Sequence, residues 1–353
     1  MGFTVGRNGP QNPLRSTPVL APGWTRWTFH ADSSSPNGLG SAPVRCEAVA
    51  RSVRIDTDRQ PVVEATVTLS AETDAMARTL SAISVHDSGA PNGALELSAL
   101  VGHSTAGGFR ARLDSALRQV GGCSALAMFL LDDLPGITLV GGYAEQYEDS
   151  RTGVDAISEI FASNPEAIDF QADTCAGWAE EATLISSLRN DGEMLTPVGP
   201  PAPALWTTAH TQAPQATGSW HPIPPLSANT TRRVRRIDLG PDDGGERRFE
   251  THFRDSHADF GTTERVLHEY LVRGTLRDGV IADLDAEARV LPWMECPSAL
   301  ASAQRCVGQR VGKLRSLVRH DFRGTSTCTH LNDTIRSLDS IATMGGLDAP
   351  PHR

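Results

Sequence analysis

The feature that most limits how this chain of 353 residues can fold is an ordered similarity between its two halves. Each half has a basic strand-like segment, a Val-Gly pair, a basic amphipathic run, a glycine turn and a cysteine. The matching segments are RSVRID (51–56) and LVGHSTAGGFRARLDSALRQVGGCSAL (100–126), then RRVRRID (232–238) and CVGQRVGKLRSLVRHDFRGTSTCTHL (306–331). Two related modules about a pseudo-two-fold axis are therefore predicted, their interface standing where a homodimer's would be. The alternative is two units that are alike by chance.

The order of elements within the halves predicts an α+β fold with antiparallel sheets and packed helices. After a Pro-rich stretch, four segments with alternating or β-rich content are separated by turn residues, and two helical segments follow. Strands that precede helices in this way favour an antiparallel sheet with its helices segregated. The four strands are expected at 232–239, 247–254, 266–276 and 280–285, and the two helices at 298–306 and 312–322.

The first half is less regular. Strand-like content spans 46–69, and apolar spacing predicts a helix over 107–120 with a second one opening at Cys123. The run ITLVGGY at 137–143 is typical of a strand, and 153–161 of a short amphipathic helix. The predicted organisation is an irregular N-terminal arm (1–45), a first α+β module (46–196), a Pro-rich connector (197–228) and a second α+β module (229–345).

Charge and composition limit the partners. The net charge of -10 and the pI of about 5.6 argue against nucleic acid as a partner. No apolar run is long enough for a membrane span, and the N-terminus lacks the pattern of a secretory signal. Six scattered cysteines without a CxxC pair indicate reduced thiols, which favours a cytoplasmic protein. A homodimer stays open.

The strongest local signal for chemistry is the segment RGTSTCTHLNDTIRSL at 323–338. Three N-cap residue types, Thr325 to Thr327, precede Cys328, which predicts that this cysteine lies at the start of a helix. The N–H groups and the dipole at such a position favour a thiolate. His330 follows two residues later, whereas the first-half copy has Ala125 there.

Further residues extend this candidate site. In the strand VLHEYLV, alternation places His268 and Tyr270 on one face, and Cys296 follows later in the segment PWMECP. One reading is Cys/His acid–base or nucleophilic chemistry by Cys328, His330, His268 and Tyr270. Another is a soft metal, zinc or iron, held by Cys328, His330, His268 and Cys296, and a third is that these groups only fill the core.

Residue types also indicate candidates for substrate binding and a second cluster. Among four clustered arginines (232, 233, 235 and 236), Arg235 is a candidate for holding an anionic group, although such a strand can also be a charged edge. Cys175 and Trp178 could line a pocket. A run with two histidines and two acids could bind a hydrolytic metal or form a solvated loop: His252, Asp255, His257 and Asp259.

The second half also resembles a bacterial family known as domain of unknown function 2889. The resemblance rests on RRVRRIDL, VLHEYLV, PWMECP, the VGQRVG turn and CTHL at 328–331, over roughly residues 230–340 and more weakly over 50–190. The family's CTHL follows a glycine, where this chain has Thr327. The family name implies no activity.

No P-loop, GxGxxG, HExxH or GxSxG motif occurs in the sequence. The expected function is therefore an intracellular non-redox enzyme, a lyase, isomerase or hydrolase without a cofactor, acting on a small organic acid, ester or thioester. The competing expectation is a non-catalytic binding or assembly protein that holds a metal through Cys and His.

Overall fold

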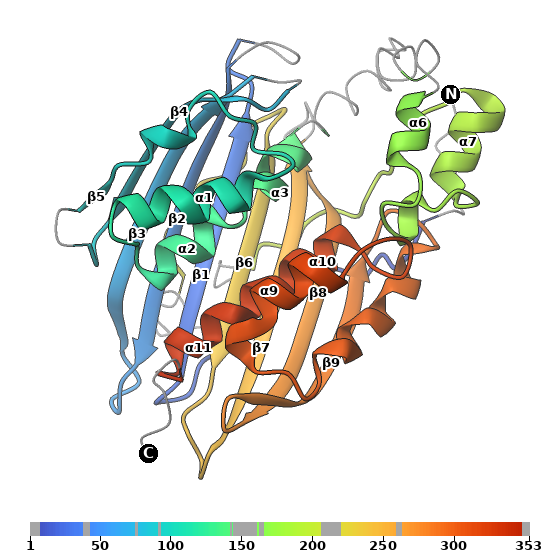
Figure 1. Ribbon diagram of the computed structural model, residues 1–353. Helices are drawn as coiled ribbons and strands as arrows, with labels where there is room; N and C mark the ends of the chain where they lie inside the picture. Colours follow the sequence, from blue (N-terminus) through green and yellow to red (C-terminus); the bar gives the residue numbers. More distant parts are fainter. Residues whose placement is uncertain are drawn as a thin grey trace.

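In the part of the chain that the structure describes, nine strands form one antiparallel sheet (Figure 1). The computed structural model describes residues 8–37, 43–74, 77–90, 93–141, 143, 161, 166–205, 220–258 and 263–347. The strand order is β5-β4-β3-β2-β1-β6-β7-β8-β9, and every neighbouring pair is antiparallel. The strands are β1 (Thr25–Ser34), β2 (Val44–Ile55), β3 (Pro61–Thr73), β4 (Leu80–Asp87), β5 (Ala94–Leu95), β6 (Thr231–Leu239), β7 (Glu246–Ala258), β8 (Glu264–Arg277) and β9 (Val280–Val290).

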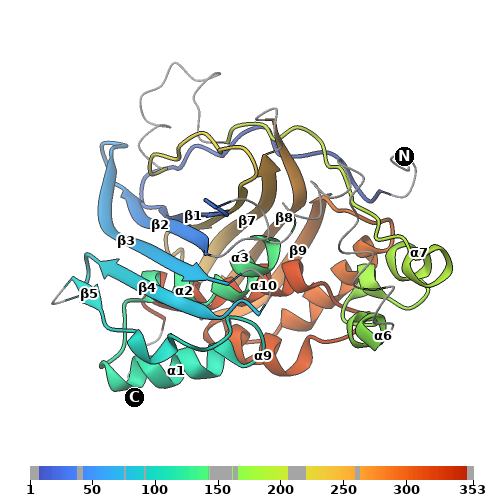
Figure 2. The same ribbon diagram turned by 90° about the horizontal axis from the view of Figure 1, so that it is seen from above.

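Helices cover one face of this sheet (Figure 2). Helix α2 contacts β2 and β3, and α10 contacts β7 and β8. The helices are η1 (Ser98–Leu100), α1 (Phe109–Gln119), α2 (Ala125–Leu131), α3 (Leu134–Gly141), α6 (Glu166–Gln171), η2 (Ala176–Trp178), α7 (Thr183–Asp191), η3 (Cys296–Cys306), η4 (Val311–Lys313), α9 (Leu314–Asp321), α10 (Thr329–Ser337), η5 (Leu338–Ser340) and α11 (Ile341–Met344). The α+β class with an antiparallel sheet is thus confirmed. Given their length and polarity, none of the helices in the described part of the chain could span a lipid bilayer.

The two halves meet at β1 and β6, which pair along nine residues of each strand. One apolar cluster runs through both halves, from Trp27 and Phe29 on β1 to Phe253 on β7 and Leu331 on α10. The predicted modules are therefore neighbouring parts of one sheet with a common core.

The other face of the sheet is crossed by irregular segments at residues 8–24, 197–205 and 220–230 (Figure 2). Buried arginines donate hydrogen bonds to their backbone carbonyls: Arg26 to Pro18 O (2.9 Å), Arg232 to Pro224 O (2.8 Å) and Arg254 to Leu14 O (2.9 Å) and Pro203 O (2.7 Å). The described parts of the Pro-rich segment are thus attached to the sheet. Its Trp220 is buried, and Trp206 lies outside the described residues.

Three expectations need correction. The arm predicted at 1–45 contains strand β1, whose Trp27, Phe29 and Ala31 alternate into the core. The run at 137–143, expected as a strand, lies largely in helix α3, where its apolar side chains pack on the sheet. RSVRID lies in β2, the second strand of its half, whereas RRVRRID forms β6, the first strand of the other. The helix expected at 153–161 lies almost wholly outside the described residues.

Candidate functional site

Two neighbouring strands place an acid and an imidazole side by side on the helix-covered face. Asp255 of β7 is directly opposite His268 of β8, and the register shifts by one residue immediately after Asp255. Asp255 is fully buried, whereas His268 is partly accessible. Bulges of this kind re-aim side chains and are common beside functional sites.

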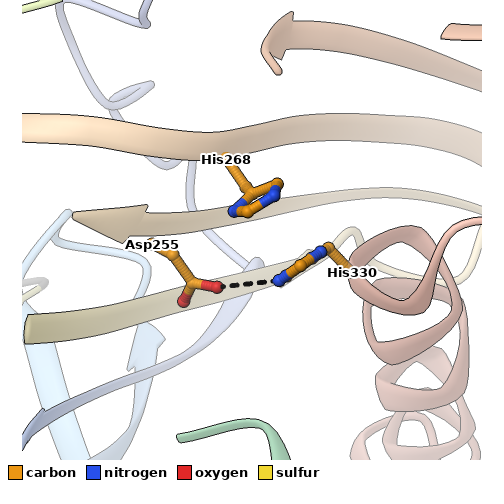
Figure 3. A group of neighbouring side chains, drawn as sticks. All are labelled: Asp255, His268 and His330. Atoms are coloured by element: carbon orange, nitrogen blue, oxygen red, sulfur yellow. Dashed lines mark ion pairs between the residues drawn. The ribbon is translucent and has the colours of Figure 1, made fainter. Parts of the chain in front are cut away.

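Helix α10 brings a second imidazole to the same point (Figure 3). Cys328 is its N-cap residue, as predicted, and His330 is in the first turn. The His330 ring stacks on the His268 ring with a centroid separation of 3.6 Å and an interplanar angle of 16°. His330 Nε2 lies 3.6 Å from Asp255 Oδ2. Among the described residues, these three are the one group of potential metal ligands whose donor atoms all lie within 4.8 Å of one another.

Burial keeps both imidazoles neutral at ordinary pH. It lowers the pKa of His330 to about 3, and the positive charges of Arg233 and Arg235 act in the same direction. It also lowers the pKa of His268 well below its usual value, with a contribution from His330. Neutral imidazole is the form that binds a metal ion, whereas a pKa near 3 makes a poor proton donor or acceptor at pH 7.

Asp255 is held by Arg233 from β6. The guanidinium donates two hydrogen bonds of 2.8 Å, from Nε to Oδ1 and from Nη2 to Oδ2. Burial raises the pKa of Asp255, and Arg233 opposes this rise. Arg233 Nη1 also donates to Asp333 of α10 at 3.0 Å. The carboxylate is thus fixed in orientation beside the two rings.

A buried ion-pair network connects this site to the first half of the chain. Arg235 of β6 donates to both carboxylate oxygens of Asp133, which lies between α2 and α3, at 2.6 and 2.9 Å. Asp132 accepts from Arg336 of α10 at 2.7 Å and from Arg315 of α9 at 2.8 Å. Since Arg235 is 0 % exposed and committed to Asp133, its predicted role in binding a substrate anion lacks an accessible group.

Cys328 lies against the imidazole cluster, but it is a buried thiol. Its Sγ is 3.9 Å from His330 Nδ1, and only 4 % of the residue is exposed. Burial raises its pKa, although the Tyr270 hydroxyl and the N–H groups of Leu331 and His330 oppose this. The position at the helix start was predicted correctly, while the environment does not favour the expected thiolate.

The remaining predicted residues gather behind Cys328. Tyr270 lies next to Cys328, and burial raises its pKa well above the usual value. Burial also raises the pKa of Cys175, to about 12, and that of Cys296. Gly177 precedes the half-buried Trp178, and a side chain at Gly177 would collide with the sulfur of Cys296. These residues therefore lie together in a compact, thiol-rich region. Among the described residues, the donor atoms of His268, His330 and Asp255 lie within 4.8 Å of one another, whereas the two-cysteine metal set expected from the sequence does not form such a group.

The second predicted cluster separates across the sheet. His252 is on the face opposite to Asp255 and hydrogen bonds with Glu269 at 2.7 Å. The His257 ring meets the Tyr143 ring edge-on at 5.5 Å. Asp259 lies outside the described residues. The sequence pattern grouped Asp255 with His252 and His257, whereas the structure places it beside His268 and His330. The signal that could have located it was the antiparallel pairing of β7 with β8.

Comparisons with known proteins bear on the second half alone. No curated protein and no solved structure matches the chain. The family model described as "Protein of unknown function (DUF2889)" matches residues 231–344, which run from the first residue of β6 to the last residue of α11 and contain all three residues of the imidazole–carboxylate cluster. The resemblance of the second half to this family is thereby confirmed.

Proposed function

We propose that this protein binds a divalent transition-metal ion through His268, His330 and Asp255. Two imidazoles and one carboxylate form a donor set used for zinc and for non-haem iron. Such a set leaves coordination positions open for water or a substrate.

The observation that carries the proposal is the 3.6 Å separation of His330 Nε2 from Asp255 Oδ2. A direct N–H···O hydrogen bond would be about 2.7–3.2 Å long. Ligand bonds of about 2.0–2.2 Å at a tetrahedral ion place two ligand atoms about 3.4 Å apart. His330 Nδ1 faces Cys328 Sγ at 3.9 Å and Thr329 Oγ1 at 3.4 Å, which suits a proton on Nδ1 and a lone pair on Nε2 directed at Asp255.

The lone pair of an imidazole nitrogen lies in the ring plane, so the two stacked rings hold their lone pairs in nearly parallel planes, and binding one ion requires a tilt of one ring. His330 is the ring that can move, because it is in the first turn of α10 and its side chain is 14 % exposed. His268 Nδ1 is buried without a hydrogen-bond partner, so an ion would satisfy a polar atom that the described structure leaves alone.

The bound ion would give the chain the non-redox chemistry expected from its sequence. An open-sited divalent ion polarises carbonyl groups and activates water, which fits hydrolysis or lyase chemistry on a small organic acid, ester or thioester. All six cysteines are free, which supports a reducing, cytoplasmic location. Binding without catalysis is the alternative outcome.

A second candidate is chemistry by Cys328 itself, favoured by its contact with His330. A thiol–imidazole pair is the arrangement of a nucleophile and its base. The variant Cys328→Ser separates the two candidates. If Cys328 is the nucleophile, this variant should lose turnover; if the site is a metal site, it should keep its ion.

The test is elemental analysis of purified protein after dialysis against zinc or iron, followed by titration of the metal-free protein with Co²⁺. We expect about one ion per chain and visible d–d absorption. His330→Ala and His268→Ala should lose the ion, while the matched control His320→Ala, at an exposed position on α9, should keep it. Wild-type protein that binds no ion would disprove the proposal.

A further inference from the structure

The two halves repeat each other in ways that go beyond strand order. Strands β1 and β6 correspond at an offset of 206 residues in the sequence, so that Arg26 corresponds to Arg232 and Asp32 to Asp238. These residues form two equivalent ion pairs across the seam, Arg26–Asp238 and Arg232–Asp32, each 2.6 Å from Nε to Oδ1. The carbonyls that accept from the two arginines, Pro18 and Pro224, are also 206 residues apart.

Two of the three register shifts in the second-half strands recur in the first half. The register shifts after Ser52 in β2 and after Asp255 in β7, positions 203 residues apart. It shifts again after Glu72 in β3 and after Thr275 in β8, also 203 residues apart. Bulges are specific local features, so their coincidence at two points is not expected from a shared fold class alone.

This correspondence locates the counterpart of the metal site. In β2 and β3, Ser52 is opposite Ala65, as Asp255 is opposite His268. Ala125, in the first turn of α2, corresponds to His330 in the first turn of α10. Helix α2 contacts β2 and β3, as α10 contacts β7 and β8.

Burial agrees position by position. Ser52 and Asp255 are buried, while Ala65 and Ala125 are half-buried, as His268 and His330 are. The residue opposite the carboxylate position also differs between the halves. Trp27, opposite Ser52, stands where the second half has Arg233 opposite Asp255. The two imidazoles, the carboxylate and the guanidinium of the second-half site thus correspond to small or apolar side chains in the first half.

We infer that the chain is an internal duplication whose first half has the same backbone arrangement as the divalent transition-metal site, at Ser52, Ala65 and Ala125, but without its ligands. The inference takes its ligand class from the proposed function. It predicts one ion per chain in the natural protein and a second, restorable position in the first half.

The test grafts the ligands in full-length protein that carries His268→Ala and His330→Ala. Adding Ala65→His and Ala125→His should restore about one Co²⁺ or Zn²⁺ per chain, measured by equilibrium dialysis and d–d absorption, and adding Ser52→Asp should tighten binding. The control pairs Ala65→His with Arg118→His on α1, which is exposed and away from the equivalent position. This control should bind no ion.

Folded grafts that bind no more metal than the control would overturn the inference. If the new histidines weaken the fold, the midpoint of thermal unfolding should rise with added Zn²⁺ in the graft and not in the control; an equal response in both would also overturn it. Because the grafts lack the second-half imidazoles, they can bind metal even if the wild type does not, so the two proposals fail separately.

Discussion

Arg235 allows a direct test of whether the buried charges serve stability or ligand binding. We expect Arg235→Met to destabilise the protein strongly and to leave metal binding by the folded fraction unchanged. Arg235 is 0 % exposed, and its two hydrogen bonds go to Asp133, which is itself buried. Its removal leaves a carboxylate in the interior without its main partner.

The magnitude follows from the contacts that stay. Losing one partner of a buried ion pair costs about 3–5 kcal/mol. Asp133 keeps longer contacts with Arg233 at 3.4 Å and Arg336 at 3.9 Å, so we expect the lower end of that range. A loss of about 3 kcal/mol corresponds to roughly a 100-fold change in the ratio of folded to unfolded protein.

Urea unfolding followed by tryptophan fluorescence measures this loss, provided that the m-value is unchanged. The double variant Arg235→Met/Asp133→Asn should be less destabilised than the sum of the single variants, because neither charge is then left alone. A loss below about 1 kcal/mol for Arg235→Met would refute the structural assignment. A selective loss of ligand binding at unchanged stability would instead restore the role of Arg235 in substrate binding.

Three further predictions follow from the site. His330 has a pKa of about 3 in the folded chain and an ordinary value near 6.5 when unfolded, so its contribution to stability is complete above about pH 6.5 and declines as the pH falls toward 3; His330→Ala should flatten this part of a urea-unfolding pH profile. Cys328 should react slowly with a thiol reagent in the native protein and at an ordinary rate in urea, and rapid native labelling assigned to it by mass spectrometry would contradict its burial. Gly136→Ala should cost about 1–3 kcal/mol, because the new methyl group would collide with Arg233 and Asp333, and an unchanged urea midpoint would show that this contact relaxes freely.

The strands of the second half could be predicted because the turns between them contain residue types that favour few backbone conformations. Asp278 and Gly279 both have positive φ between β8 and β9, as do Gly244 and Gly245 between β6 and β7. Asp and Gly adopt this conformation more readily than other residues, so the turns and the strands around them could be located. The N-cap position of Cys328 followed from local signals in the same way.

The secondary structure of the first half depends on long-range contacts, which a local sequence pattern cannot indicate. Ile137, Thr138 and Val140 have strand-like side chains, yet they pack as helix α3 on β1 and β6. Strand β1 lies among Gly- and Pro-rich residues and is ordered by pairing with β2 and with the distant β6. Burial and pairing partners overrode local preference at both places.

The candidate site could be predicted only in part, for the same reason. His268 and His330 were identified from residue type and spacing, but their partner Asp255 depends on register. Strand β7 extends four residues beyond the predicted limit of 254, and it is this extension that carries Asp255 to the position opposite His268. Residue type could identify the imidazoles, whereas the carboxylate required the pairing of two strands.

One arginine influences the protonation of both the carboxylate and the imidazoles in this cluster. Arg233 donates two hydrogen bonds to Asp255 and opposes the rise in its pKa that burial causes, so it favours the ionised carboxylate. The same positive charge lowers the pKa of His330 and of His268, so it favours neutral rings. An ionised carboxylate beside neutral imidazoles is the protonation state that a metal ion requires.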